Sequence, residues 1–78
     1  MEPKDLMYYH TNKKNVELTQ QCKTENGIEE YELPFFIHRI VGAFEQVVIR
    51  NQYGRKIKIN PNQIEEPKKI IKVKKPKK

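Results

Sequence analysis

The segment from Val47 to Ile64 constrains the fold of this chain more than any other. It begins with a β-branched run, passes through a polar turn that ends at Gly54, and then alternates lysine with isoleucine from Lys56 to Ile59. A period of two predicts a strand with one buried face, because successive side chains of a strand point to opposite sides. The short turn predicts a hairpin in which Gly54 can adopt a positive φ.

Further strands are expected on both sides of this hairpin. Alternation of apolar and polar residues predicts a half-buried strand over residues 15–23. The dipeptide Asn26-Gly27 follows it, and this pair is the strongest short hairpin signal, so we expect a returning strand over residues 28–33. Towards the other end, Pro61 stops ladder pairing because it lacks an N–H group, and the chain re-enters extended structure near Ile64.

Residues 33–48 fit two different structures. Their apolar residues match the spacing of a helix, but Gly42 and the many β-branched and aromatic residues disfavour one. We favour a strand over residues 35–41, a bend at Gly42-Ala43, and a second strand from Phe44 onward.

A short helix near Pro3 is expected at the N-terminus. Proline is tolerated in the first helical turn, and Asp5 suits the positive end of the helix dipole. In one interpretation this segment is an arm that packs Leu6 and one tyrosine on the core. In the other, three neighbouring residues form a stacking surface for bases, namely Tyr8, Tyr9 and His10.

With 78 residues, the chain is expected to form a single folded domain with a stability of about 3–5 kcal/mol. We divide it into an N-terminal arm or helix over 1–14, a β domain over 15–73 that could include a last strand at 71–73, and a lysine-rich tail over 74–78 that we expect to be disordered. No apolar run reaches about 18 residues, so no membrane span is expected. A cytoplasmic protein is predicted, or a nuclear one if the tail acts as an address.

The net charge of +6 originates in the last eleven residues. Residues 68–78 hold seven lysines and no acid, whereas the other 67 residues hold nine basic and ten acidic side chains, a net charge of −1. Glu17–Glu32 contains five acids against one lysine, and Arg39–Lys58 contains five basic residues against one acid. An acidic first half and a basic second half indicate two different faces.

No catalytic motif is present. The chain lacks a glycine-rich phosphate loop, a Gly-x-Ser-x-Gly elbow, a His-Glu-x-x-His pair and an acidic calcium loop. Glu30 and Glu32 could act as acid and base, but no histidine or cysteine lies near them in sequence. Cys22, His10 and His38 match no zinc spacing. We therefore predict a non-enzyme without a metal or cofactor.

Short strands joined by tight turns predict a mainly β fold, a small five-stranded, partly open barrel of the SH3-like or Sm-like kind. Residues Ile40–Ile49 resemble the strand-and-bend part of the Sm family, including the bacterial Hfq proteins, in having an apolar pair, a glycine, an aromatic residue, an acid and an apolar strand. Residues Ile57–Ile64 are similar to that family's second motif, and also to the turn before the last strand of SH3 domains. The resemblance implies RNA binding through turn residues, here Asn60, Asn62 and Gln63, and it allows a homo-oligomer.

Two functions follow as hypotheses. In the first, the protein binds nucleic acid, RNA in preference to DNA, through basic residues that contact phosphates, a tyrosine that stacks on bases, and a lysine tail that adds non-specific attraction. The expected binding residues are Arg39, Arg50, Tyr53, Arg55, Lys56, Lys58, Asn60, Asn62, Lys72, Lys74 and Lys75. In the alternative, the chain is a protein-interaction module or inhibitor of a larger partner that it contacts through the acidic face Glu25–Glu32.

Overall fold

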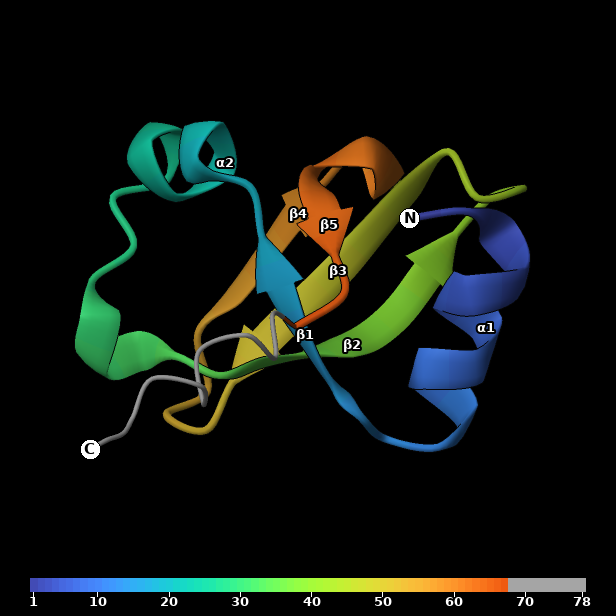
Figure 1. Cartoon of the computed structure of the whole chain (residues 1–78), viewed down its shortest axis with the longest axis horizontal. Coiled ribbons are helices and arrows are strands. Elements are labelled where there is room, and N and C mark those ends of the chain that lie inside the picture. Colours follow the sequence, from blue (N-terminus) through green and yellow to red (C-terminus); the bar gives the residue numbers. More distant parts are fainter. Residues whose placement is uncertain (68–78) are drawn as a thin grey trace, which may run out of the picture.

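The computed structural model describes residues 1–67, and its five strands and two α-helices alternate with short turns (Figure 1). The elements are α1 (Pro3–Thr11), β1 (Asn15–Leu18), α2 (Gln20–Glu25), the 3-10 turn η1 (Glu30–Glu32), β2 (Phe35–Val41), β3 (Gln46–Asn51), β4 (Lys56–Ile59), the 3-10 turn η2 (Pro61–Gln63) and β5 (Ile64–Glu65). The predicted strand at 71–73 and the predicted tail lie outside the described residues.

The strands form one antiparallel sheet in the order β4-β3-β2-β1-β5. β1 joins its two halves, because it pairs with β2 at Val16–Phe35 and with β5 at Leu18–Ile64. The sheet curls, so that β1 and β5 cross in front of β2 and β3 in Figure 1, with α1 and α2 at opposite ends. The mainly β fold and the N-terminal helix are confirmed, but over residues 1–67 the sheet is not closed into a barrel.

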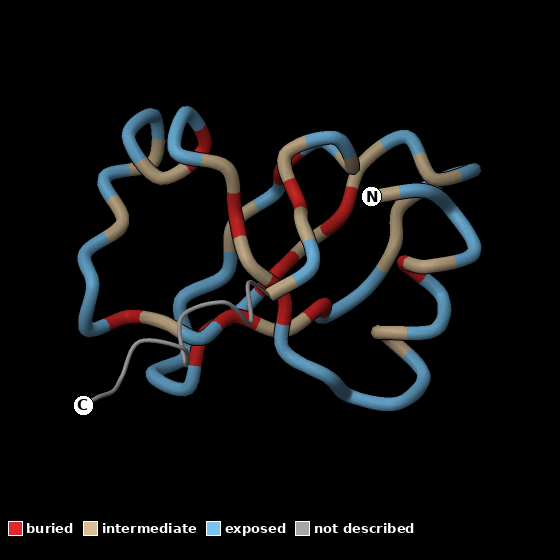
Figure 2. Tube along the Cα trace, in the orientation of Figure 1, coloured by how far each residue is buried: buried red, intermediate tan, exposed pale blue. Residues whose placement is uncertain are grey.

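One hydrophobic core draws side chains from both α-helices and all five strands. Figure 2 shows buried positions along the strands and on both α-helices, while most loop positions are exposed or intermediate. The core residues are Leu6, Val16, Leu18, Cys22, Phe35, Ile37, Val47, Ile49, Ile59 and Ile64. Leu6 is fully buried and Tyr9 packs partly against the core, so α1 is attached to the sheet as the first interpretation of residues 1–14 expected.

The two central hairpins follow the predicted pattern. β2 has the predicted bounds, and a four-residue turn leads from it to β3. β3 begins at Gln46 rather than at Phe44, because Phe44 adopts a φ of 65° in the turn. In the second hairpin, Gly54 has a φ of 91°, and the side-chain oxygen of Asn51 accepts hydrogen bonds from the backbone N–H groups of Tyr53 and Arg55.

The predicted strand over residues 15–23 is wrong beyond Leu18. Thr19 ends the strand and caps α2, because its hydroxyl oxygen accepts a hydrogen bond from the backbone N–H of Cys22 at 3.2 Å. Cys22 is still buried, but from a helix. The apolar residues of this segment are therefore buried, but they lie on one strand and one short helix instead of on a single strand.

The hairpin predicted at Asn26-Gly27 is also wrong. These residues end α2, where Gly27 has a φ of 59° and its N–H bonds to the carbonyl of Thr24. The N–H of Ile28 bonds to the carbonyl of Lys23, which completes a Schellman motif. A glycine with positive φ serves a helix C-terminus as well as a hairpin, and here it does the former. Residues 28–33 consequently form no strand; they contain the turn η1.

The carboxylate of Glu32 is buried at the end of η1, with 5% of the residue exposed. Both of its oxygens accept hydrogen bonds from the Arg55 guanidinium at 2.8 Å, and Asn51 donates to one of them at 3.2 Å. The backbone N–H of Glu29 donates to the other oxygen at 3.0 Å. This backbone bond and the contact with Arg55 lower the pKa of Glu32 below its ordinary value.

A pH titration of stability tests the role of this carboxylate. Because the folded-state pKa of Glu32 lies below the unfolded value, its contribution is complete above about pH 4.5 and disappears as the pH falls through the folded-state pKa. Glu32→Gln should therefore be less stable than the wild type at neutral pH, and the difference should shrink on acidification. Urea unfolding at several pH values measures this. The exposed Glu30→Gln is the control, and equal pH profiles for wild type and Glu32→Gln would contradict the assignment.

Adjacent phenylalanines on opposite faces of β2 give a second test. Phe35 is fully buried, so Phe35→Ala should cost about 3–5 kcal/mol, as much as the whole stability expected of so short a chain. Phe36 is half-buried, and Phe36→Ala should cost on the order of 1 kcal/mol. Circular dichroism should show an unfolded Phe35→Ala and a folded Phe36→Ala; the reverse result would mean that the strand faces are assigned incorrectly.

Candidate nucleic-acid interface

The outer surface of β2, β3 and β4 carries basic side chains in two rows. In an antiparallel sheet, directly paired residues point to the same face. The register pairs Phe36 with Arg50 and Arg50 with Lys56, and it pairs Arg39 with Val48 and Val48 with Lys58. We call this surface the basic face; its side chains are Phe36, Arg39, Val48, Arg50, Lys56 and Lys58.

A β-bulge in β2 adds a further group beside the basic face. The register shifts between Ile37 and Arg39, so His38 has no paired residue on β3. His38 and Arg39 are both exposed, whereas Ile40 returns to pack against the core. An extra residue in one strand changes the alternation in this way. The bulge thus exposes two consecutive side chains that can be positively charged.

The cations of the basic face are free of acidic partners within the described residues. The ion pairs of residues 1–67 are Lys23–Glu17 at 3.2 Å and Arg55–Glu32 at 2.8 Å, and neither involves this face. The Arg50 guanidinium instead lies 5.9 Å from the centre of the Phe36 ring, within the range of a cation–π contact. Four of the nine lysine and arginine residues of positions 1–67 thus lie on this face, although these positions sum to a charge of −1.

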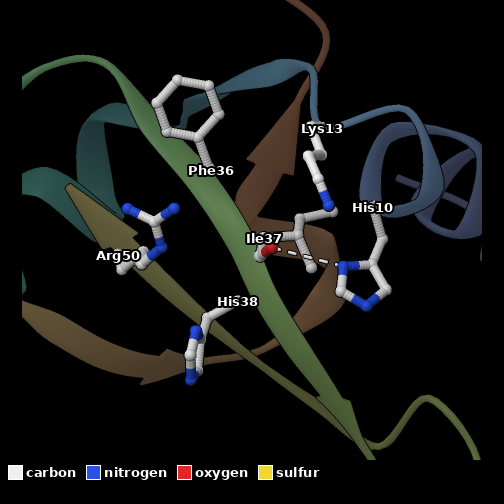
Figure 3. Close-up of a pocket in the computed structure, with 6 residues that line it drawn as sticks. All are labelled: His10, Lys13, Phe36, Ile37, His38 and Arg50. Carbon is white, nitrogen blue, oxygen red and sulfur yellow. Dashed lines mark hydrogen bonds between the residues drawn. The ribbon is translucent and has the colours of Figure 1, made fainter. Parts of the chain in front are cut away.

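A cleft of about 390 Å³ opens beside the basic face, and Figure 3 shows the side chains that line it. It lies where the end of α1 and the loop after it approach β2 and β3. We call it the Phe36 cleft; its lining residues are His10, Lys13, Phe36, Ile37, His38 and Arg50. These are one aromatic ring, one aliphatic residue and four basic side chains, without a carboxylate.

The position of His10 is fixed by a hydrogen bond to the strand. Its Nδ1 lies 3.2 Å from the carbonyl oxygen of Ile37, the residue immediately before the bulge (Figure 3). A carbonyl can only accept, so Nδ1 carries the hydrogen. In the described residues, Nε2 of His10 makes no hydrogen bond and remains available to a ligand. The contact anchors the end of α1 at the cleft.

The structure brings together four of the predicted binding residues, Arg39, Arg50, Lys56 and Lys58, on the basic face. Arg55 does not join them, because its guanidinium is bound to Glu32 and to the carbonyl oxygen of Asn26. It ties the β3–β4 hairpin to the segment after α2. The geometry therefore gives Arg55 a structural contact in place of the predicted phosphate contact.

The remaining predicted residues lie elsewhere. Tyr53 is 66% exposed at the hairpin tip, where its ring packs edge-on against the exposed Tyr31 with centroids 6.2 Å apart. Asn60 caps η2 through a reciprocal pair of hydrogen bonds with Gln63, and Asn62 is exposed within that turn. The predicted lysines of the chain end lie outside the described residues, namely Lys72, Lys74 and Lys75.

Sequence reasoning missed Phe36 and Lys13 and did not join His10 to His38. The signal for Phe36 was available, because alternation in the predicted strand requires one of two neighbouring phenylalanines to face outward. Lys13 had no such signal. It reaches the cleft only because α1 packs against β2, and no local pattern specifies that contact.

Comparison with protein-family models, with curated proteins and with solved structures finds no match to this chain. Neither α-helix of the described residues has the length and apolar character needed to cross a membrane. Residues 1–67 also contain no group of three or more histidine, cysteine or acidic side chains placed to hold a metal ion. Cys22 is enclosed in the core, where burial raises the pKa of its thiol.

Neighbouring residues of the second hairpin separate a structural cation from a surface one. Arg55→Gln breaks the contact with the buried Glu32 and should clearly lower the melting temperature. Lys56→Gln removes the same charge from an exposed strand position and should change stability by less than about 0.5 kcal/mol. Thermal unfolding of both variants measures the difference. Equal melting temperatures would show that Arg55, like Lys56, is a surface cation without a structural role.

Proposed function

We propose that this protein is a non-enzymatic nucleic-acid-binding protein that prefers RNA to DNA and contacts phosphates through the basic face. The observation that carries the proposal is the set of four exposed cations on three adjacent strands, without an acidic partner in the described residues. Phosphate contacts supply most of the affinity in such complexes, and they need accessible lysine and arginine side chains.

The spacing of the basic face suits a phosphate backbone. Neighbouring strands lie about 5 Å apart, and residues two apart on one strand lie about 7 Å apart. Lys56 and Lys58 are separated along β4 in this way, and Arg50 and Arg39 extend the array across β3 and β2. The rigid sheet holds these positions, so a backbone that crosses the face can meet several cations. The lysines of residues 68–78 would add non-specific attraction.

The preference for RNA rests on the exposed aromatic rings and on the resemblance to Sm-like or SH3-like domains. RNA recognition commonly uses bases that are splayed out and stacked on aromatic side chains. Phe36 lies within the basic face, and the Tyr31–Tyr53 pair lies at the tip of the β3–β4 hairpin.

The alternative function, a protein-interaction module that uses the acidic segment Glu25–Glu32, receives less support. Glu32 is buried and paired with Arg55, and its carboxylate also accepts a hydrogen bond from the backbone N–H of Glu29. The Glu25 carboxylate accepts hydrogen bonds from Gln21 and Gln63. Two of the four acids of this segment, Glu25 and Glu32, thus accept hydrogen bonds from their own chain, while Glu29 and Glu30 are exposed.

A salt titration tests the proposed function. Affinity for a short single-stranded RNA should fall with salt, with a slope of about 0.7 in the logarithmic plot for each phosphate contact. The double variant Lys56→Gln/Lys58→Gln removes two cations of the basic face and should reduce that slope by about 1.4. Fluorescence anisotropy at several salt concentrations measures both quantities.

The matched control is Lys4→Gln/Lys14→Gln, which loses the same charge from exposed positions of α1 and of the loop after it and should keep the wild-type slope. Absence of binding to any RNA or DNA at low salt would remove the proposal. An equal loss of slope in the two double variants would show that net charge, rather than the basic face, causes the binding.

A further inference from the structure

We propose that the Phe36 cleft binds one unstacked nucleobase together with its phosphate, so that the protein selects single-stranded over duplex nucleic acid. This inference rests on the proposed function and names the part of the ligand that the basic face alone would not recognise. The cations of a flat face bind phosphate groups, whereas a cleft with an aromatic wall can bind the planar ring of a base.

The size and lining of the cleft fit one nucleotide. Its volume of about 390 Å³ falls near the lower end of the range of roughly 300–1,000 Å³ for small-molecule sites. Four of its six lining side chains carry or can carry a positive charge, and none is acidic. A ligand that combines a flat apolar surface with an anionic group matches this lining, and a nucleotide has both.

Phe36 supplies the stacking surface. Its side chain is half-buried and projects from the outer face of β2, so part of the ring is accessible. The Arg50 guanidinium lies 5.9 Å from the ring centre, close enough to contact a base on Phe36 or the phosphate attached to it. Every base has a π face, so stacking at this position would tolerate different sequences.

Cations lie on both sides of the strand that carries the ring. Figure 3 shows Arg50 and His38 to the lower left of β2, with Phe36, Lys13 and His10 to its upper right. The hydrogen bond from His10 to the Ile37 carbonyl orients the imidazole, and leaves Nε2 for a polar group of the ligand. A nucleotide in the cleft can therefore contact a ring, an arginine and a lysine without a rearrangement of the backbone.

The cleft discriminates between single and double strands for a geometric reason. A base within a duplex is paired and stacked, and it must be extruded before it can contact a side chain inside a cleft. A base in a single strand is already free to turn outward. Duplex binding would consequently use the basic face without Phe36, whereas single-strand binding would use both.

Substitution of the ring tests this inference with the full chain. Phe36→Leu keeps an apolar side chain but removes the ring, and should weaken binding of a short single-stranded RNA about 5- to 150-fold, the range expected for one stacked base. Phe36→Trp keeps an aromatic surface and should retain the wild-type affinity. Binding of a duplex of the same sequence should be equal in all three proteins, and circular dichroism verifies that each is folded.

A mononucleotide titration gives an independent measurement of the cleft. Adenosine monophosphate should shift the backbone amide signals of residues around the cleft in NMR spectra of the wild type, while ribose 5-phosphate, which lacks the base, should shift them much less. The shifts should disappear in Phe36→Leu and persist in Phe36→Trp. Equal effects of the two ligands would overturn the inference, because they would show recognition of phosphate alone.

These outcomes separate the inference from the proposed function. Single-strand binding that is steeply salt-dependent but identical in Phe36→Leu and the wild type would overturn the inference and leave the basic face as the binding surface. If the wild type binds neither RNA nor DNA at low salt, the proposed function fails, and the mononucleotide titration alone decides whether the cleft takes a nucleotide.

Discussion

The buried contact between Glu32 and Arg55 holds together the two parts of the chain that local sequence does not connect. A carboxylate with 5% exposure would be costly without partners, and here it receives hydrogen bonds from Arg55, Asn51 and the backbone of Glu29. Asn51 also closes the β3–β4 turn, so the same network fixes the hairpin and the segment after α2. The basic face depends on that hairpin, because β4 supplies half of its cations.

Because side chains alternate along the strands, the sheet has one apolar surface and one basic surface. The inner surface of the sheet packs isoleucine, valine and phenylalanine into one core with Leu6 of α1. The outer surface of the same strands presents lysine and arginine, which pair with no acid of residues 1–67. The acids of the first half of the chain are used differently, since Glu17, Glu25 and Glu32 bind groups of their own chain. The sequence suggested an acidic half and a basic half. The structure has a basic surface, and beside it an acidic segment in which several carboxylates bind groups of their own chain.

The parts of the fold that the sequence predicted are those that local interactions specify. The β3–β4 hairpin was predicted because alternation and a turn glycine act over a few residues, and β2 because Gly42 and the many β-branched and aromatic residues disfavour a helix. The segment over 19–33 was not, because Thr19 can end a strand or cap a helix, and Gly27 fits either a hairpin or a helix C-terminus. Alternation would place Arg39 on the core side with Phe35 and Ile37, and only the bulge turns it outward. The other three cations of the site, Arg50, Lys56 and Lys58, could be predicted from alternation. The Phe36 cleft could not, because it requires the packing of α1 on β2 and a choice between two adjacent phenylalanines.

The β-bulge at His38 has a consequence for how this protein can change. Beyond Ile37, the inward and outward positions of β2 are out of step with those before it, so Ile40 packs inside although it lies an odd number of residues from Ile37. Removal of His38 would bring Ile40 to two residues from Ile37, which leaves both on the core side and keeps Arg39 opposite Val48 in a regular ladder. The sheet therefore does not need the extra residue. The Phe36 cleft does, because the bulge adds the His38 side chain to its lining, next to the Ile37 carbonyl that holds His10.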